Sequence, residues 1–169
     1  MSLSMYQASI PVFVRMLNNL SAILGKAAAH AEAKKIDPSV FIRDRLAPDM
    51  LPLSFQVQTA SDMAKGCAAR LAGIQPPSFP DTEATFPELK ERVAKTLAFL
   101  QTVSAAQIDG SEDRNITLRP GGGREYRFVG QSYLLTFVLP NFYFHITTAY
   151  NILRHNGVEL GKQDFLGDL

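Results

Sequence analysis

Apolar residues recur at intervals of three and four along three long stretches of the chain, which is the spacing of a helix with one buried face. The stretches run from about residue 5 to 35, from 49 to 72 and from 85 to about 104. Their apolar positions are Tyr6, Ile10, Phe13, Leu17, Leu20, Leu24, Ala27 and Ala31; Met50, Leu53, Val57, Ala60, Ala64, Cys67 and Leu71; and Phe86, Leu89, Val93, Leu97 and Leu100. Each stretch predicts an amphipathic helix.

A fourth helix is predicted from residue 131 to 156, and its second half is apolar nearly all round. Such a helix belongs in the middle of a bundle. Pro140 lacks a backbone donor, so a kink is expected there. Asn141, His145 and Thr148 stand at i, i+4 and i+7 and form one polar stripe on the apolar helix. Burying an unpaired polar group costs roughly 2–7 kcal/mol, so the stripe predicts either a hydrogen-bonded core network or a site.

Short signals fill the segments between these helices. Asp37-Pro38 is a capping pair that predicts a short helix ending before Pro48, and residues 74–88, with four prolines, predict a rigid linker. From Asn115 the pattern changes to alternation around a glycine-rich turn, which predicts a β-hairpin. The fold class is therefore all-α: one domain, residues 1–169, forming a four-helix bundle with a small hairpin before the last helix.

Composition removes several classes of function. Seventeen basic and sixteen acidic side chains give a net charge of +1, which gives no electrostatic support for binding nucleic acid or an anionic membrane. The single cysteine, Cys67, cannot form an internal disulfide and lies on an apolar seam, where an inert buried thiol is expected. The sequence has neither a leader pattern nor an apolar run long enough to cross a membrane. These features predict a cytoplasmic protein.

Histidine spacing does not predict a zinc site. None of the three histidines has a second one at i+4, and His155 follows His145 by ten residues, roughly 15 Å along a helix. From the residues alone, no metal is expected.

A family resemblance adds to this reading. The segment FHITTAYNILRHNG resembles the last-helix signature of the DinB-like (YfiT-like) superfamily of four-helix bundles, many of which hold a divalent metal such as Zn or Ni. That resemblance places His145 at the second histidine of an i, i+4 pair, Asn141 at the first, and Gln56 at a histidine of the second helix. Relatives with all three histidines include metal-dependent hydrolases and thiol transferases that act on small molecules. Here two of the three ligand positions carry amides, which are poor zinc ligands.

A longer resemblance covers nearly the whole chain. RLAPDMLPLSFQVQ, LPNFYFHITTAYNILRHNG and GKQDFLG together resemble an uncharacterised branch of that superfamily, known only as a domain of unknown function. The resemblance implies the bundle and often a homodimer. Small residues crowd the far end of the first helix, from Gly25 onward, and are consistent with close approach of another helix or chain.

Three hypotheses follow. In the first, Gln56, Asn141 and His145 meet in the interior as a metal-free hydrogen-bonded network beside Thr148 that lines a small-molecule pocket or fixes the helix register. In the second, His145 and a carboxylate such as Asp49 hold a divalent metal and catalyse hydrolase or transferase chemistry. In the third, the protein is a dimeric interaction module whose function lies on its surface.

Overall fold

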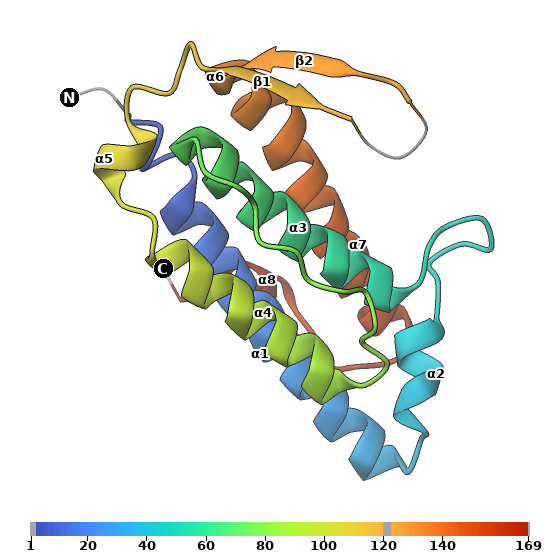
Figure 1. Ribbon diagram of the computed structural model, residues 1–169. Coiled ribbons are helices and arrows are strands. Elements are labelled where there is room, and N and C mark those ends of the chain that lie inside the picture. Colours follow the sequence, from blue (N-terminus) through green and yellow to red (C-terminus); the bar gives the residue numbers. More distant parts are fainter. Residues whose placement is uncertain (1–2, 120–122, 169) are drawn as a thin grey trace.

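The computed structural model (Figure 1) describes residues 3–119 and 123–168. Four long helices form the predicted bundle: α1 (Ile10–Lys34), α3 (Leu53–Ala72), α4 (Phe86–Gln101) and α7 (Leu139–His155). The shorter elements are α2 (Pro38–Arg43), α5 (Ala105–Ile108), β1 (Asn115–Leu118), β2 (Tyr126–Val129), α6 (Gly130–Ser132), the π-helical segment η1 (Tyr133–Val138) and α8 (Lys162–Leu166). The predicted all-α class with one hairpin before the last long helix is confirmed.

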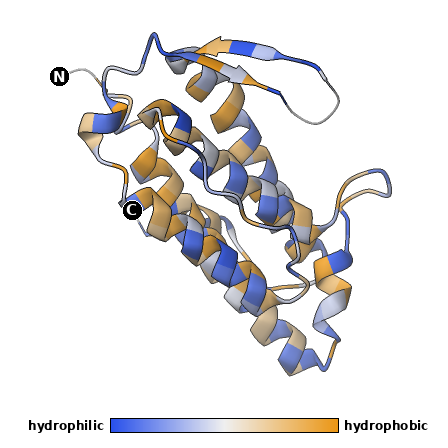
Figure 2. Ribbon diagram, viewed as in Figure 1, coloured by the Kyte–Doolittle hydropathy of each residue, from blue (hydrophilic) through white to orange (hydrophobic). Residues whose placement is uncertain are grey.

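The four long helices pack in a ring in which α3 contacts α4 and α7, and α1 contacts the same two helices. Hydrophobic and hydrophilic segments alternate along each of them (Figure 2), as the apolar seams require. The seam residues Leu17, Val57 and Val93 have no exposed surface, and neither has Ile146 of α7. Cys67 is also fully buried, and burial raises the pKa of its thiol well above the usual range, so it is the inert core residue that the sequence predicts.

Two helices begin later than the sequence predicts. Residues 5–9 form turns and α1 begins at Ile10, with Pro11 in its first turn, where a missing N–H costs nothing. The second long helix begins at Leu53, because Pro52 occupies the N-cap with an extended backbone and residues 46–50 form a bent connection. The start predicted at residue 49 was therefore wrong by one helical turn, and Asp49 lies outside the helix.

The last helical segment runs without a break from Gly130 to His155. Directly before Pro140 it contains the six-residue π-helical segment η1, at the place where the sequence predicts a kink. A proline in an α-helix removes one hydrogen bond and collides with the carbonyl four residues before it. Widening the preceding turn displaces that carbonyl, and the helix continues through Pro140.

The remaining elements cover the outside of the bundle. The hairpin is antiparallel, pairs Asn115 with Val129, and lies at the opposite end of the bundle from α2 (Figure 1). The tail folds back over the bundle: α8 packs on α1, the amide of Asn19 donates to the Phe165 carbonyl at 2.9 Å, and the Phe165 ring contacts Tyr150. No helix in the described ranges is long and apolar enough to cross a membrane.

Candidate functional site

The polar stripe of α7 contacts α3 through one pair of side chains. Nδ1 of His145 lies 2.7 Å from Oε1 of Gln56, and Nε2 of Gln56 donates to the Leu51 carbonyl at 2.8 Å. Gln56 is only 2% exposed, so both ends of its amide are satisfied inside the protein. The chain Leu51–Gln56–His145 links the connection before α3 to the middle of α7. Of the three residues predicted to meet, Gln56 and His145 are in hydrogen-bond contact.

This hydrogen-bond chain determines the tautomer of His145. Because Nε2 of Gln56 donates to a carbonyl, its Oε1 faces the imidazole and can only accept. Nδ1 of His145 therefore carries the proton, and in the neutral ring Nε2 has a lone pair. Nothing in the described part of the chain hydrogen-bonds to that Nε2 atom.

The imidazole lies among aromatic rings and stays neutral. Phe144 meets it edge-on at a centroid distance of 5.3 Å, and Phe55 does so at 6.1 Å. His145 itself is half-buried, and this burial lowers its pKa. Phe55 and Phe144 are 36% and 55% exposed, so the rings reach the surface beside the histidine. The arrangement presents one neutral, oriented nitrogen acceptor on an apolar surface.

The other predicted site residues are bonded elsewhere. Nδ2 of Asn141 donates to the Phe137 carbonyl at 2.8 Å, a carbonyl at the π-helical segment, and the Thr148 hydroxyl donates to a carbonyl of its own helix. Asp49 is exposed on the connection before α3. No hydrogen bond among the described residues joins Asn141, Thr148 or Asp49 to the Gln56–His145 pair. The stripe predicted as one network is therefore one inter-helical pair beside two polar groups that hydrogen-bond within the last helical segment, Asn141 to η1 and Thr148 within α7.

These residues do not fit a tightly bound transition metal. The Gln56 amide is occupied at both ends and the Asn141 amide nitrogen is bonded to its own helix, so the one available donor of the zinc-binding kind is Nε2 of His145. No group of three or more His, Cys, Asp or Glu side chains suited to an ion occurs within residues 3–119 and 123–168. A single imidazole without an anionic ligand does not offset a divalent charge.

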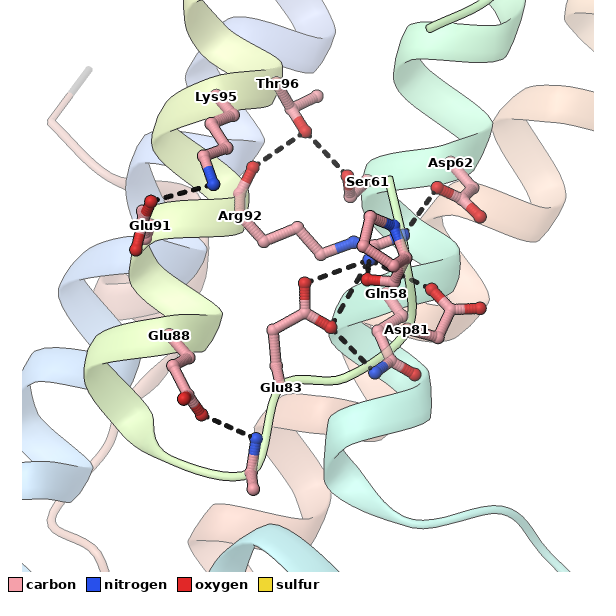
Figure 3. A network of polar contacts seen from close by, with 12 residues as sticks. Gln58, Ser61, Asp62, Asp81, Glu83, Glu88, Glu91, Arg92, Lys95 and Thr96 are labelled. Carbon is pink, nitrogen blue, oxygen red and sulfur yellow. Dashed lines mark hydrogen bonds and ion pairs between the residues drawn. The ribbon is translucent and has the colours of Figure 1, made fainter. Parts of the chain in front are cut away.

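A second polar cluster, which the sequence reading missed, surrounds Arg92 of α4 (Figure 3). The Arg92 side chain is 1% exposed and pairs with Asp62 of α3 at 2.8 Å and with Asp81 and Glu83 of the proline-rich linker at 2.9 and 3.0 Å. Burial of Glu83 would raise its pKa, but hydrogen bonds from Gln58 and Arg92 outweigh burial and hold that pKa below its usual range. The cluster fastens the linker across α3 and α4.

Spacing alone could have indicated that Arg92 is buried. Arg92 and Thr96 follow Leu89 by three and seven residues, which places them on the inward stripe of α4. Thr96 completes that stripe by a 2.6 Å hydrogen bond to Ser61 of α3. The cluster is structural, since its charged groups pair with one another.

Comparisons with known proteins agree on one family. Residues 5–166 match the model described as a domain of unknown function, DUF1993. The chain is also similar to a solved structure, a DinB family member protein from Shewanella denitrificans, with 42% identity over 97% of this chain and 92% of that one and a TM-score of 0.88. No curated protein matches it.

Proposed function

Because this chain belongs to the DUF1993 family, a domain of unknown function with a DinB-type bundle, we propose that it binds a small molecule through His145 without a metal. The observation that carries the proposal is the bond between Gln56 and His145, which fixes the imidazole as the Nδ1–H tautomer and leaves Nε2 to accept a hydrogen bond. This role does not require the three histidine ligands of a metal site.

The surroundings of the imidazole indicate the kind of molecule. Phe55 and Phe144 flank His145 and are both partly exposed, so an aromatic or other apolar body can cover them. The ring nitrogen accepts and does not donate, which selects a ligand bearing a hydroxyl or another N–H or O–H donor. The lowered pKa keeps the imidazole neutral at pH 7 and so keeps this selectivity. We therefore propose an apolar ligand with one hydrogen-bond donor.

The metal-dependent hydrolase or thiol transferase reading is less well supported. It requires anionic or imidazole ligands around His145, and Gln56 and Asn141 contribute amides that are already bonded. Asp49, the carboxylate that could have completed a site, lies on an exposed connection.

A phenol titration followed by NMR tests the proposal. Phenol offers one O–H donor on an aromatic body, and anisole has the same body without the donor. We expect the 15N spectrum of the free protein to show the Nδ1–H tautomer of His145, and phenol, but not anisole, to shift the Nε2 resonance. An Nε2–H tautomer, or equal shifts with both compounds, would contradict the proposal.

A second candidate function, a homodimeric interaction module, is favoured by one observation. Phe144 of α7 is 55% exposed and Phe55 of α3 is 36% exposed, and both rings contact the His145 ring. Large aromatic side chains of this kind are enriched at the cores of protein interfaces. A second copy of the chain covering this face would close the site around His145, so the two candidate functions share one surface.

A further inference from the structure

Two arginines line an open cleft at the hairpin end of α3, far from His145. A hollow of about 450 Å³ is lined by Arg70, Arg114, Gln75 and Thr117 among others, and a second of about 240 Å³ continues from it, since Arg70 and Thr117 line both. The volume of the larger hollow falls within the range of ordinary ligand sites. Arg70 stands fourteen residues after Gln56 on the same helix, roughly 21 Å along its axis, so the cleft is separate from the His145 site.

Arg70 is held in place by a glycine and a tyrosine. A Cβ at Gly66 would lie 2.5 Å from Nη1 of Arg70, so the guanidinium rests on the helix where Gly66 has no side chain. The same Nη1 donates to the Tyr133 hydroxyl at 3.0 Å. A glycine inside a helix costs about 1 kcal/mol of helix stability relative to alanine. At Gly66 the missing side chain leaves the space that the Arg70 guanidinium occupies.

Arg114 repeats this arrangement at Gly73, which follows Gly66 by seven residues. Its guanidinium carbon lies 3.2 Å from where a Cβ of Gly73 would stand, and Gly73 caps α3 in the left-handed conformation at φ 72°. Two guanidinium groups therefore lie over two glycines on one side of α3 and line the same hollow.

The positive charge of this cleft is not neutralised by the protein. No carboxylate in the described ranges forms an ion pair with Arg70 or Arg114. Segment 114–129 carries four arginines and one acid, Glu125, which pairs with both Arg119 and Arg127. The negative end of the α3 dipole amounts to about half a charge, too little to offset two guanidinium groups.

The second hollow supplies an apolar surface beside the charge. Met63, Leu118 and Phe137 line it together with Tyr133, whose ring stacks on Phe137 at a centroid distance of 6.0 Å. Burial raises the pKa of Tyr133 to about 12, so its hydroxyl keeps its proton. That hydroxyl accepts from Arg70, and its own proton has no acceptor among the described residues. The hydroxyl therefore has a free donor beside Arg70, the residue that lines both hollows.

We propose that this cleft binds a small amphiphilic anion, a carboxylate on a short alkyl or aryl body, with the carboxylate held between Arg70 and Arg114. A planar guanidinium matches a carboxylate in a two-point contact, which favours this head group. The apolar body lies over Leu118 and Phe137, and the Tyr133 hydroxyl donates to the carboxylate.

Calorimetric titration with three matched probes tests the proposal: octanoate, octanamide without the charge, and acetate without the tail. Octanoate is expected to bind at least about tenfold more tightly than either of the others, since a hydrogen bond to a charged group contributes about 1.5–3 kcal/mol. Equal affinities of octanoate and octanamide, or of octanoate and acetate, would overturn it.

Two variants, with one control, distinguish loss of the Arg70 guanidinium contact from loss of the fold. Arg70→Gln should weaken octanoate binding about tenfold, whereas Arg154→Gln, an exposed arginine on α7, should leave it unchanged. Gly66→Ala should also weaken binding, because the new methyl displaces the flexible end of Arg70, while the melting temperature stays at or above wild type. Wild-type affinity in both Arg70→Gln and Gly66→Ala contradicts the proposal.

Discussion

Nδ1 of His145 lies 2.7 Å from Oε1 of Gln56, although 89 residues separate the two in the chain. The bond joins α7 to α3 at a single point along two helices that otherwise meet through apolar side chains. A buried polar pair on such a surface penalises every register in which it is not formed. The pair therefore fixes the register of α3 against α7 while presenting the imidazole.

We predict that His145→Ala lowers the free energy of unfolding by about 1–3 kcal/mol, because it leaves the buried Gln56 oxygen without a donor. Urea unfolding measures the loss. His155→Ala, which removes an exposed histidine of the same helix, is the control and should stay within about 0.5 kcal/mol of wild type. A similar loss in both variants would show that the Gln56–His145 hydrogen bond adds nothing specific to the free energy of unfolding.

A pH dependence follows from the lowered pKa of His145. The folded protein binds this proton less readily than the unfolded chain, whose histidines titrate near about 6.5. Between the folded pKa and 6.5 the unfolded state binds more protons, so stability rises with pH. The stabilisation linked to neutral His145 is fully present above about pH 6.5, and it is lost as the pH falls toward the pKa of His145 in the folded protein. Unfolding free energies of wild type and His145→Gln at several pH values should converge on acidification.

Helical periodicity accounts for most of the fold. The seams from Ile10 to Ala31 and from Leu53 to Leu71 are buried as their spacing predicts, and the capping box of Thr85 and Glu88 forms. The hairpin also appears where alternation replaces the helical period. These features depend on neighbours in sequence, which is why a single sequence determines them.

What the sequence did not predict depends on contacts between distant segments. Arg92 could be recognised as inward-facing, but its partners Asp81 and Glu83 lie on a linker whose path no local signal gives. The π-helical segment before Pro140 replaces a simple kink for a similar reason, since the backbone around a proline adapts to its packing. The sequence predicted that Asn141 would meet Gln56, because Asn141 lies on the polar stripe. Its amide instead donates a hydrogen bond to the Phe137 carbonyl.

We predict that a chelator leaves the melting temperature of the wild-type protein unchanged. Nε2 of His145 is the one strong donor at the site, and a bound ion would stabilise the fold only in proportion to its affinity. Protein purified without an affinity tag is scanned with and without EDTA, and its metal content is determined by mass spectrometry. Stoichiometric zinc or nickel with a lowered melting temperature in EDTA would favour the metal-dependent hypothesis.

The Arg92 cluster predicts a graded series of stability losses. Arg92→Leu leaves the nearly buried Glu83 unpaired and should cost about 3–5 kcal/mol, the range for one broken partner of a buried pair. Asp81→Asn removes a partner that is 60% exposed, and solvent screening should keep its loss within about 0–1 kcal/mol. Equal losses from the two substitutions in urea unfolding would show that burial of the pair does not set its strength.

The last prediction concerns the aromatic face formed by Phe55 and Phe144 on either side of His145. We expect a homodimer in solution that uses this face, because monomeric proteins rarely leave a large apolar patch exposed. Sedimentation equilibrium at micromolar concentration should give the dimer mass for wild type. Phe144→Ser should shift the equilibrium toward monomer, whereas Ile74→Ser, which removes a 41% exposed apolar side chain from the linker, should not. A wild-type monomer at this concentration contradicts the homodimer, and an unchanged dimer in Phe144→Ser places its interface elsewhere. In the second case the rings beside His145 stay open, and the proposed apolar ligand is the occupant that remains for them.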